Sequence, residues 1–376
     1  MKYFIACYTF FAFGCQAELP KPGTEVLSHQ VLYEDTEVYA AWPAIVRASN
    51  DDLLVAFTAT EAHLSPDGRI VMIRSSDNGE SWSAPEEVFN SIVDDRESGL
   101  TRLRDGRILA HIWSTHWKRA QYETQYDNHQ TNERVQRWIQ QVDSPAYLAA
   151  AQQHGAWLLL SEDDGQTWGP ARKGPDTIHG GVELQDGSLL VASYRLQKNH
   201  IGVYTTPHPD STWTLKATVH SPMPDSIRFG EPHVVQLNSG RILMMIRPTA
   251  IPYDDKDPRL YLWLSWSDDN GMTWANPIET PLWGFPPHLL QLQDGRVVVV
   301  YGHRRPPYGQ RAAISSDGIT WDADNIITLR DDAPNHDLGY PASIELAPDT
   351  VLTVYYQKQP EGKVDILGTI WVAGDY

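Results

Sequence analysis

Six copies of one pattern of apolar and polar residues are spread along the chain. Each copy is an apolar run, a short polar turn such as Asp-Gly or Ser-Gly, and a second apolar run, which predicts two β-strands joined by a tight turn. Most neighbouring turns lie about 54 residues apart, a spacing that suits a four-stranded unit copied around a ring. We therefore predict an all-β fold, a six-bladed β-propeller. The equivalent turn residues are Asp51, Asp105, Asp186, Ser239, Asp294 and Asp349.

A second repeat, Ser-x-Asp-x-Gly-x-x-Trp, interleaves with these hairpins. It occupies residues 75–82, 161–168 and 267–274, and a copy that is one residue shorter occupies residues 315–321. The Asp side chain can accept hydrogen bonds from its own turn, the Gly allows a positive φ, and the Trp covers the turn with an apolar face. The repeat therefore indicates turns at the edges of blades, away from any chemistry.

The second predicted blade is longer than the others, because 81 residues separate its turn from the next one. The extra sequence, about residues 118–154, carries apolar residues at helical spacing, so we expect a helical insertion of one or two helices. These apolar residues are Val135, Trp138, Ile139 and Val142. We also expect the segment 25–40 to supply a strand to the last blade and to close the ring.

The N-terminus has the pattern of a secretion signal. A lysine at the second position precedes an apolar stretch and a small-residue site, which predicts a signal peptide over residues 1–17, cleaved after Ala17. The mature protein, residues 18–376, would then be one propeller domain, secreted or periplasmic. The Gly-Cys pair at Cys15 also offers a lipoprotein cleavage site, which would add a lipid anchor. Since Cys7 and Cys15 are the two cysteines, the mature chain forms no disulfide.

The composition narrows the range of partners. The chain has 30 Lys and Arg against 48 Asp and Glu, a formal net charge of −18, which argues against nucleic acid and against anionic membrane surfaces. The 14 Trp and 17 Tyr supply aromatic surface for a large core and for stacking on sugars. The histidine spacing suits no metal site, and we expect no cofactor.

In a propeller, the loops at one end of the innermost strands surround a central cavity. The residues just before each first apolar run, and just after each second run, should meet there. Trp42 and Trp113 suit either sugar platforms or core packing, and the histidines suit either ligand contacts or structural hydrogen bonds. The candidate cavity residues are Trp42, Glu97, Trp113, His179, Arg195, Glu231, His233, Arg247, His288, Arg304 and Tyr340.

The Ser-x-Asp-x-Gly-x-x-Trp copies resemble the Asp boxes, or BNR repeats, of the sialidase (neuraminidase) superfamily, whose catalytic domain is a six-bladed propeller. The resemblance covers nearly all of the mature chain. The Gly-Glu-Pro-His segment at Glu231 is similar to the family's fourth-blade glutamate segment, and the Gly-Tyr pair at Tyr340 is similar to the pair that begins its sixth blade. Arg247 fits the arginine that ends the next strand, and Arg304 and Arg311 compete for the fifth-blade arginine.

The resemblance implies a mechanism. Sialic acid bears a carboxylate on its anomeric carbon, which would repel a carboxylate nucleophile, so sialidases use a neutral tyrosine instead. Tyr340 would be this nucleophile, and Glu231 would activate it by taking its proton. Asp67 would be the general acid and base, with Glu61 and His63 as rivals. The arginines would hold the carboxylate of the substrate in bidentate pairs.

The chain departs from the family at one important position. Sialidases open the first blade with Arg-Ile-Pro, whereas this chain has Ala41 followed by Trp and Pro. Loss of one arginine from a buried carboxylate site should cost on the order of 1.5–3 kcal/mol. Either Arg195, Arg228 or Arg305 replaces it, or the substrate is not an ordinary sialoside. We favour the second explanation, with a uronic-acid-type sugar as the substrate.

Three functions fit these residues. The first is a sialidase-like hydrolase that removes an acidic terminal sugar from a glycan. The second is a polysaccharide lyase that eliminates across uronic acids, with Tyr and His as base and acid. The third is a propeller that binds carbohydrate without turning it over. The partner in each case is an acidic oligosaccharide or polysaccharide.

Overall fold

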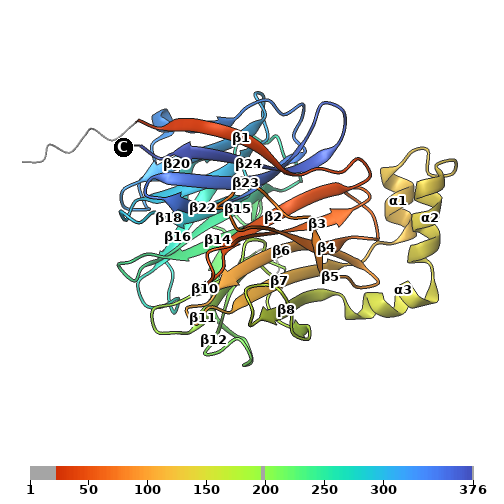
Figure 1. Cartoon of the computed structure of the whole chain (residues 1–376), viewed down its shortest axis with the longest axis horizontal. Coiled ribbons are helices and arrows are strands. Elements are labelled where there is room, and N and C mark those ends of the chain that lie inside the picture. Colours follow the sequence, from red (N-terminus) through yellow and green to blue (C-terminus); the bar gives the residue numbers. More distant parts are fainter. Residues whose placement is uncertain (1–22, 196–199, 375–376) are drawn as a thin grey trace, which may run out of the picture.

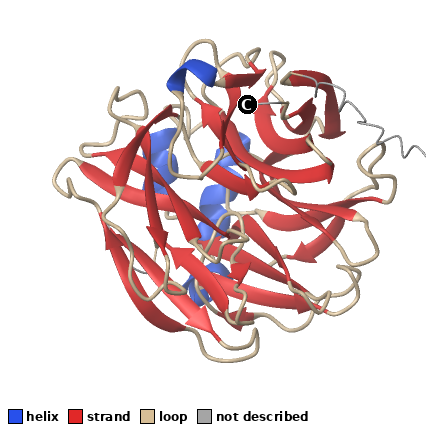
Figure 2. Ribbon diagram, turned by 90° about the vertical axis from the view of Figure 1, so that its left-hand side faces the viewer, coloured by secondary structure: helices blue, strands red, loops and turns tan. Residues whose placement is uncertain are grey.

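The computed structural model describes residues 23–195 and 200–374, and these residues are mostly β-strand (Figure 1). The strands form separate twisted sheets set side by side, as in a propeller (Figure 2). The predicted signal peptide, with Cys7 and Cys15, lies outside the described residues. Within the described ranges, no helix is both long enough and apolar enough to cross a membrane.

Four of the sheets contain four strands each, in chain order. The first has β6 (Asp94–Arg102), β7 (Ile108–Thr115), β8 (Gly155–Ser161) and β9 (Arg172–Lys173). The second has β10 (Val182–Glu183), β11 (Leu189–Ser193), β12 (His200–Thr206) and β13 (Thr214–His220). The third has β14 (Ile227–Gln236), β15 (Ile242–Ala250), β16 (Tyr261–Ser267) and β17 (Ile278–Trp283). The fourth has β18 (Pro287–Gln291), β19 (Val297–His303), β20 (Gly309–Ser315) and β21 (Ile327–Arg330).

The fifth sheet has eight strands and joins the two ends of the chain. It holds β22 (Leu338–Ala347), β23 (Thr350–Lys358) and β24 (Val364–Val372), followed by β2 (Tyr39–Arg47), β3 (Leu53–Thr60), β4 (Arg69–Ser75) and β5 (Glu86–Phe89). The N-terminal strand β1 (Glu25–Tyr33) pairs antiparallel with β24 along its whole length.

The sheets therefore differ from the prediction of six separate blades. Four blades are separate sheets, whereas the predicted first and last blades are parts of the eight-stranded sheet. The link between them is one parallel pair, Tyr39 with Val364, at the start of β2 and of β24. The reason is the path of the chain, because β1 lies along β24 and runs directly into β2. This leaves the first residue of β2 beside the first residue of β24.

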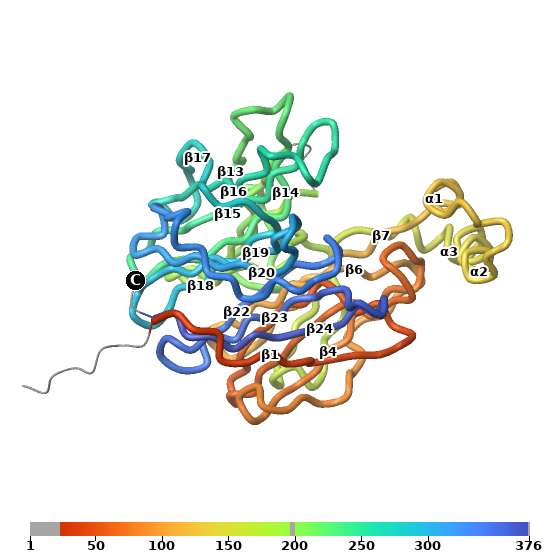
Figure 3. Tube along the Cα trace, turned by 90° about the horizontal axis from the view of Figure 1, so that it is seen from above, coloured from red at the N-terminus to blue at the C-terminus, as the bar shows by residue number. Residues whose placement is uncertain are grey.

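Helices occur between β7 and β8, within residues 118–154, where the sequence predicts one or two. The structure has α1 (Arg119–Gln125), α2 (Glu133–Val142) and α3 (Pro145–Ala150), followed by a 3-10 turn at Ala151–Gln153. They lie at one side of the strands (Figures 1 and 3). The apolar face of α2 is buried against Tyr122 and Tyr147, in a small core that also includes Val93 and Leu64 from the neighbouring strands' loops. A further 3-10 turn, Ala323–Asn325, precedes β21.

The four Ser-x-Asp-x-Gly-x-x-Trp copies have one hydrogen-bond pattern. In each, the serine hydroxyl accepts the glycine N–H, at 2.8 or 2.9 Å, and the Asp carboxylate accepts backbone N–H groups of its own turn. The turns follow the third strand of a four-strand group, after β4, β8, β16 and β20. They are therefore structural turns that lie between the third and fourth strands of each group.

Candidate active site

Four innermost strands carry the same backbone irregularity. The pairing with the next strand is interrupted, and one non-glycine residue at the interruption has a positive φ. Such a bulge redirects a side chain, and a positive φ in a bulky residue costs on the order of 1–3 kcal/mol. The repetition of this cost in four blade positions indicates that the redirected side chains serve a purpose. They are Trp42 (φ 55°), Glu97 (53°), Glu231 (41°) and Tyr340 (50°).

Tyr340 and Glu231 meet across two sheets. The Tyr340 hydroxyl donates to Oε1 of Glu231 at 2.9 Å, and Nη1 of Arg247 donates to Oε2 of the same carboxylate at 2.5 Å. The same Arg247 nitrogen lies 3.4 Å from the Tyr340 oxygen. All three residues are at least 90 % buried. The result is a phenol, a carboxylate and a guanidinium in mutual contact.

The charges of this triangle follow from its surroundings. Burial raises the pKa of Tyr340 well above its ordinary value, and the negative charges of Glu231 and Glu97 raise it further. Burial by itself would raise the pKa of Glu231, but the charge and the hydrogen bond of Arg247 hold that pKa below its usual value. At neutral pH the site therefore holds a neutral phenol that donates to an ionised carboxylate. That is the arrangement of a nucleophile beside its base.

Arg304 and Arg311, the two competing fifth-blade arginines, lie in different surroundings. Arg304 donates from Nε to the carbonyl of Leu338 at 3.0 Å, and its guanidinium carbon lies 5.8 Å from the centre of the Tyr340 ring. No carboxylate pairs with it within the described part of the chain. Arg311 instead donates to three backbone carbonyls, so its guanidinium is engaged away from Tyr340. Arg304 is thus the arginine that the structure brings to the site.

Besides the ion pair of Arg247 with Glu231, the site has a second buried ion pair. Arg195 and the carboxylate of Glu97 are in direct contact, and Nη1 of Arg195 lies 3.6 Å from Asp176. The Arg195 guanidinium is stacked between the rings of Trp113 and Tyr194, at 4.5 and 4.4 Å from the two ring centres. Trp113 therefore supports an arginine, and Arg195 is already paired with a carboxylate.

Trp42 follows Ala41, the residue aligned with the family's first-blade arginine. Trp42 is 2 % exposed, so it is not an open platform for a sugar. The guanidinium carbon of Arg96, from the next sheet, lies 4.1 Å from the centre of a Trp42 ring. Arg96 also donates to Asp94 at 3.0 Å and to the carbonyl of His63 at 2.7 Å. Of the predicted replacements, Arg228 is exposed and Arg305 lies 3.6 Å from the Trp283 ring centre.

The three candidates for the general acid and base, Asp67, Glu61 and His63, differ in what they contact. Asp67 accepts from the hydroxyl of Thr60 at 3.1 Å and from a backbone N–H at 3.4 Å. Glu61 accepts from Arg137 and from the Trp138 indole, so it ties α2 to the end of β3. His63 lies edge-on to the ring of Trp42, with ring centres 5.4 Å apart. Trp42 also lies beside Tyr340, with ring centres 6.3 Å apart, so one indole lies between His63 and the nucleophile.

Other groups near the site were not singled out from the sequence. The Tyr39 hydroxyl lies 2.7 Å from Nδ1 of His63 and donates to Asp337 at 2.7 Å. Burial raises the pKa of Asp94 to about 6, although Arg96 opposes the shift. Tyr39, Asp94 and Asp337 each precede by three residues a candidate picked from the repeat, namely Trp42, Glu97 and Tyr340. No simple signal in the pattern would have selected them.

The three predicted cavity histidines form a separate cluster. His179, His233 and His288 come from three neighbouring sheets, and their ring centres lie 4.1 to 5.4 Å apart. Burial lowers the pKa of all three, and that of His288 falls to about 3, so all are neutral at pH 7. Leu289 donates its N–H to Nδ1 of His233 at 2.8 Å. Among the described residues, no group of three or more His, Cys, Asp and Glu is arranged to hold a metal ion.

Comparison with solved structures shows the fold. A crystal structure of a protein of unknown function from Dyadobacter fermentans is 23 % identical over 93 % of this chain and 99 % of its own, with a TM-score of 0.74. NanB sialidase from Streptococcus pneumoniae, as a K499G mutant, is 13 % identical over 92 % of this chain and 70 % of its own, with a TM-score of 0.64. An α-L-arabinanase from Penicillium chrysogenum is 13 % identical over 94 % and 99 %, with a TM-score of 0.62.

The fold is therefore the one shared by these sialidase-like and arabinanase-like glycoside hydrolases. Comparison with the curated proteins gave no match. The sequence itself matches the BNR repeat-like domain over residues 134–353, which is more than half of the chain. The Asp-box resemblance seen in the sequence is thereby confirmed. The chain belongs to the BNR repeat-like domain family.

Proposed function

We propose that this protein is a glycoside hydrolase of the sialidase type that removes an acidic sugar from the end of a glycan. The observation that carries the proposal is the hydrogen bond of 2.9 Å from the Tyr340 hydroxyl to Glu231. A phenol that donates to an ionised, buried carboxylate can lose its proton as it attacks. A strained backbone holds both side chains in place, which supports a catalytic role over a packing role.

The reaction has two steps. In the first, the Tyr340 oxygen bonds to the anomeric carbon while Glu231 takes the phenol proton. The glycosidic C–O bond breaks, and a general acid gives a proton to the leaving oxygen. In the second, that acid, now a base, removes a proton from water. The water oxygen replaces the tyrosine at the anomeric carbon, and Tyr340 regains its proton.

The general acid is Asp67, with His63 as its rival, although burial and the charge of Arg96 lower the pKa of His63 to about 4 and leave it mostly neutral at pH 7. Asp67 is the family-like choice, and His63 is the rival in contact with Trp42. Replacing each in turn by Asn or Gln separates them. The true acid is the residue whose loss removes turnover of substrates with poor leaving groups and spares substrates with good ones.

The proposed substrate is a sugar with a carboxylate away from the anomeric carbon, as in a uronic acid. Arg304 has no carboxylate partner in the described residues, so its charge is open to a substrate anion. Arg247 lies against the nucleophile. The first-blade arginine of the sialidase pattern is Ala41 here, and the neighbouring guanidinium of Arg96 lies over the Trp42 ring. Two arginines suit a less crowded carboxylate better than the anomeric one of a sialoside.

Two finer points of the architecture belong to the same proposal. We infer that the eight-stranded sheet functions as two blades, because a single residue pair links its halves. With the four separate sheets, this gives a six-bladed propeller around the site. We also propose that residues 1–17 are a signal peptide that directs secretion. Outside the cytoplasm the protein would encounter long glycans.

A polysaccharide lyase is the second candidate, and the Tyr39 network favours it. If Tyr39 donates to Asp337, then Nδ1–H of His63 donates to Tyr39, and Nε2 of His63 carries a free lone pair. Such a base could take the proton next to the carboxylate of a uronic acid. The electron pair of that C–H bond would form a carbon–carbon double bond, the bond from the ring to the glycosidic oxygen would break, and a proton from water would go to the leaving oxygen.

A product screen tests these functions directly. The protein is incubated with polysialic acid, polygalacturonate and linear arabinan, and the products are separated and identified. A released acidic monosaccharide without an ultraviolet-absorbing double bond supports the hydrolase. An unsaturated uronide supports the lyase and overturns the hydrolase. Binding without any product supports the non-catalytic function, and arabinose release would overturn the acidic substrate.

A further inference from the structure

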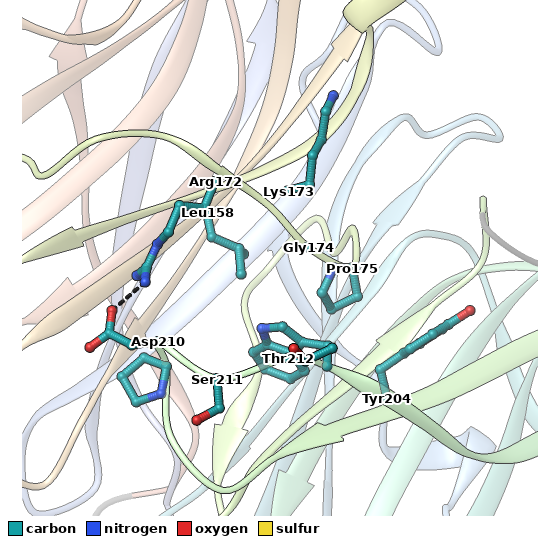
Figure 4. Close-up of a pocket in the computed structure, with 11 residues that line it drawn as sticks. Leu158, Arg172, Lys173, Gly174, Pro175, Tyr204, Asp210, Ser211 and Thr212 are labelled. Atoms are coloured by element: carbon teal, nitrogen blue, oxygen red, sulfur yellow. Dashed lines mark ion pairs between the residues drawn. The ribbon is translucent and has the colours of Figure 1, made fainter.

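Two adjoining pockets lie between the sheet of β6–β9 and the sheet of β10–β13. The first is lined by residues 172–175 and 209–213, and the second by residues 167–170. Arg172 and Asp210 line both, and they form an ion pair between the two sheets. Figure 4 shows this pair at one side of the first pocket. Each pocket encloses about 420 Å³, within the range of small-ligand sites.

These pockets lie along third and fourth strands of their sheets, whereas Tyr340 is on the first strand of its group. Tyr340 is the third residue of β22, and Glu231 is the fifth of the ten residues of β14. In an antiparallel sheet the third strand starts at the same end as the first and finishes at the other. Residues 167–170 and 209–213 follow the finishing ends of the third strands β8 and β12. Leu158 and Tyr204 lie within those third strands, and residues 172–175 belong to the fourth strand β9 or follow it. The pockets are therefore separate from the catalytic cavity.

The walls of the first pocket are held in place from both sides. A Cβ atom at Gly174 would come within 2.3 Å of the buried side chain of Leu158. The absence of a side chain at Gly174 therefore lets the segment 172–175 pack closely against Leu158. On the other side, the N–H of Ser211 donates to the carbonyl of His208 at 2.9 Å. The N–H of Asp210 donates to Nδ1 of His208 at 3.2 Å. The pocket is therefore preformed, and a ligand would meet little ordering cost.

The lining has the chemistry of a sugar site. Each pocket has one partly exposed indole, Trp168 in the second and Trp213 in the first, and such faces pack against sugar rings. The side chains of Arg172 and Asp210 are 37 % and 48 % exposed, so both can also bond to sugar hydroxyls. Lys173 is engaged elsewhere, with Nζ 3.5 Å from the ring centre of Trp157. Glu162, which is exposed, also lines the second pocket, so the open charges have a small negative excess and do not select an anion.

We propose that these two pockets, the Trp168–Trp213 groove, form a second carbohydrate-binding site that holds an internal segment of a glycan chain. Two pockets, each with one indole, suit two neighbouring sugar units. The shared ion pair lies where hydroxyls of both units would meet. This role does not depend on the reaction at Tyr340. It would keep the protein on a polymer whose ends the central site processes.

The experiment measures binding without turnover. Full-length Tyr340→Phe protein is run in native gels that contain polygalacturonate, polysialic acid or linear arabinan, and its retardation gives an affinity. We expect at least one polymer to retard it. Adding Trp213→Ala should weaken that binding at least tenfold, and adding Asp210→Ala should weaken it severalfold. Asp210 is exposed, so its replacement tests the groove even if loss of Trp213 impairs folding.

The control is Trp274→Ala, which removes a partly exposed indole outside the groove, the Asp-box equivalent of Trp168. This control should keep the affinity of the Tyr340→Phe parent. Unchanged binding in both groove variants, or no binding to any of the three polymers, overturns the proposal. Neither result bears on the hydrolase, which is judged by product release from the wild-type protein.

Discussion

At the scale of single residues, the site rests on side chains that the backbone holds at a cost. Glu231 and Tyr340 have positive φ values, and neither is a glycine that would accept them freely. Their hydrogen bond joins two sheets, so the geometry depends on the assembled fold. Arg247 keeps the carboxylate ionised and leaves the phenol as the neutral partner. The roles follow from these contacts.

Arg304 should bind the acidic group of the substrate. Arg304→Ala removes a charged hydrogen-bond donor worth about 1.5–3 kcal/mol, so kcat/KM for an acidic substrate should fall about 10- to 100-fold. Steady-state kinetics on the substrate found in the product screen measures this loss. Arg311→Ala is the matched control, because its guanidinium donates to backbone carbonyls. Equal losses in the two variants would contradict the assignment of Arg304.

Several parts of the site could be predicted from the sequence, and others could not. The repeat places Glu231, Arg247 and Tyr340 at one end of the innermost strands, and the structure brings them into contact. The repeat could not decide between Arg304 and Arg311, because both lie near the same strand end and differ only in what they contact. Nor could it show the contact between Trp42 and the guanidinium of the next sheet, which depends on how two sheets face each other.

At the scale of elements, the Asp boxes fix the turns after third strands. In the shortest copy, Asp317 accepts from the N–H groups of Ile319 and Thr320 at 2.8 and 2.7 Å, and from the hydroxyl of Ser315 at 2.9 Å. The hydrogen-bonding logic of this motif is local, which is why the sequence alone predicts it. The pairing of β24 with β2 is not local, and the hairpin pattern therefore did not reveal the eight-stranded sheet.

Asp317→Ala should destabilise this turn without touching the chemistry. The side chain is exposed, so we expect a loss of about 1 kcal/mol in the free energy of unfolding. Urea unfolding measures it, with the exposed neighbour Ser316→Ala as the control. Turnover should stay at the wild-type value, because this turn lies at the end of β20 away from Tyr340. A large loss of activity in a folded Asp317→Ala protein would contradict the separation of scaffold and site.

At the scale of the whole molecule, three sheets meet at the histidine cluster, and this makes stability depend on pH. The pKa of His288 in the folded protein is about 3, because burial disfavours the charged ring. In the unfolded chain a histidine has a pKa of about 6.5. The unfolded chain therefore binds a proton that the folded protein does not. The stabilisation is fully present above about pH 6.5 and is lost as the pH falls toward 3.

His288→Gln should weaken this dependence. Below pH 6.5 the free energy of unfolding of the variant should fall less steeply than that of the wild type, by about 1.4 kcal/mol per pH unit. Urea unfolding at pH 7, 6 and 5 measures the two slopes. His208→Gln, on an exposed loop, should keep the wild-type slope. Parallel curves for His288→Gln and the wild type would show that the cluster does not exclude protons as its burial implies.

The central claim is that Tyr340 is the nucleophile, and turnover by Tyr340→Phe protein tests it most directly. Tyr355→Phe is the matched control, since it removes the hydroxyl of a buried tyrosine of the same sheet that is 2.8 Å from Thr369. With the acidic substrate, Tyr340→Phe should lose about three orders of magnitude in kcat while its unfolding midpoint stays close to that of the wild type. Tyr355→Phe should keep its kcat. Wild-type turnover by a folded Tyr340→Phe protein would contradict the account.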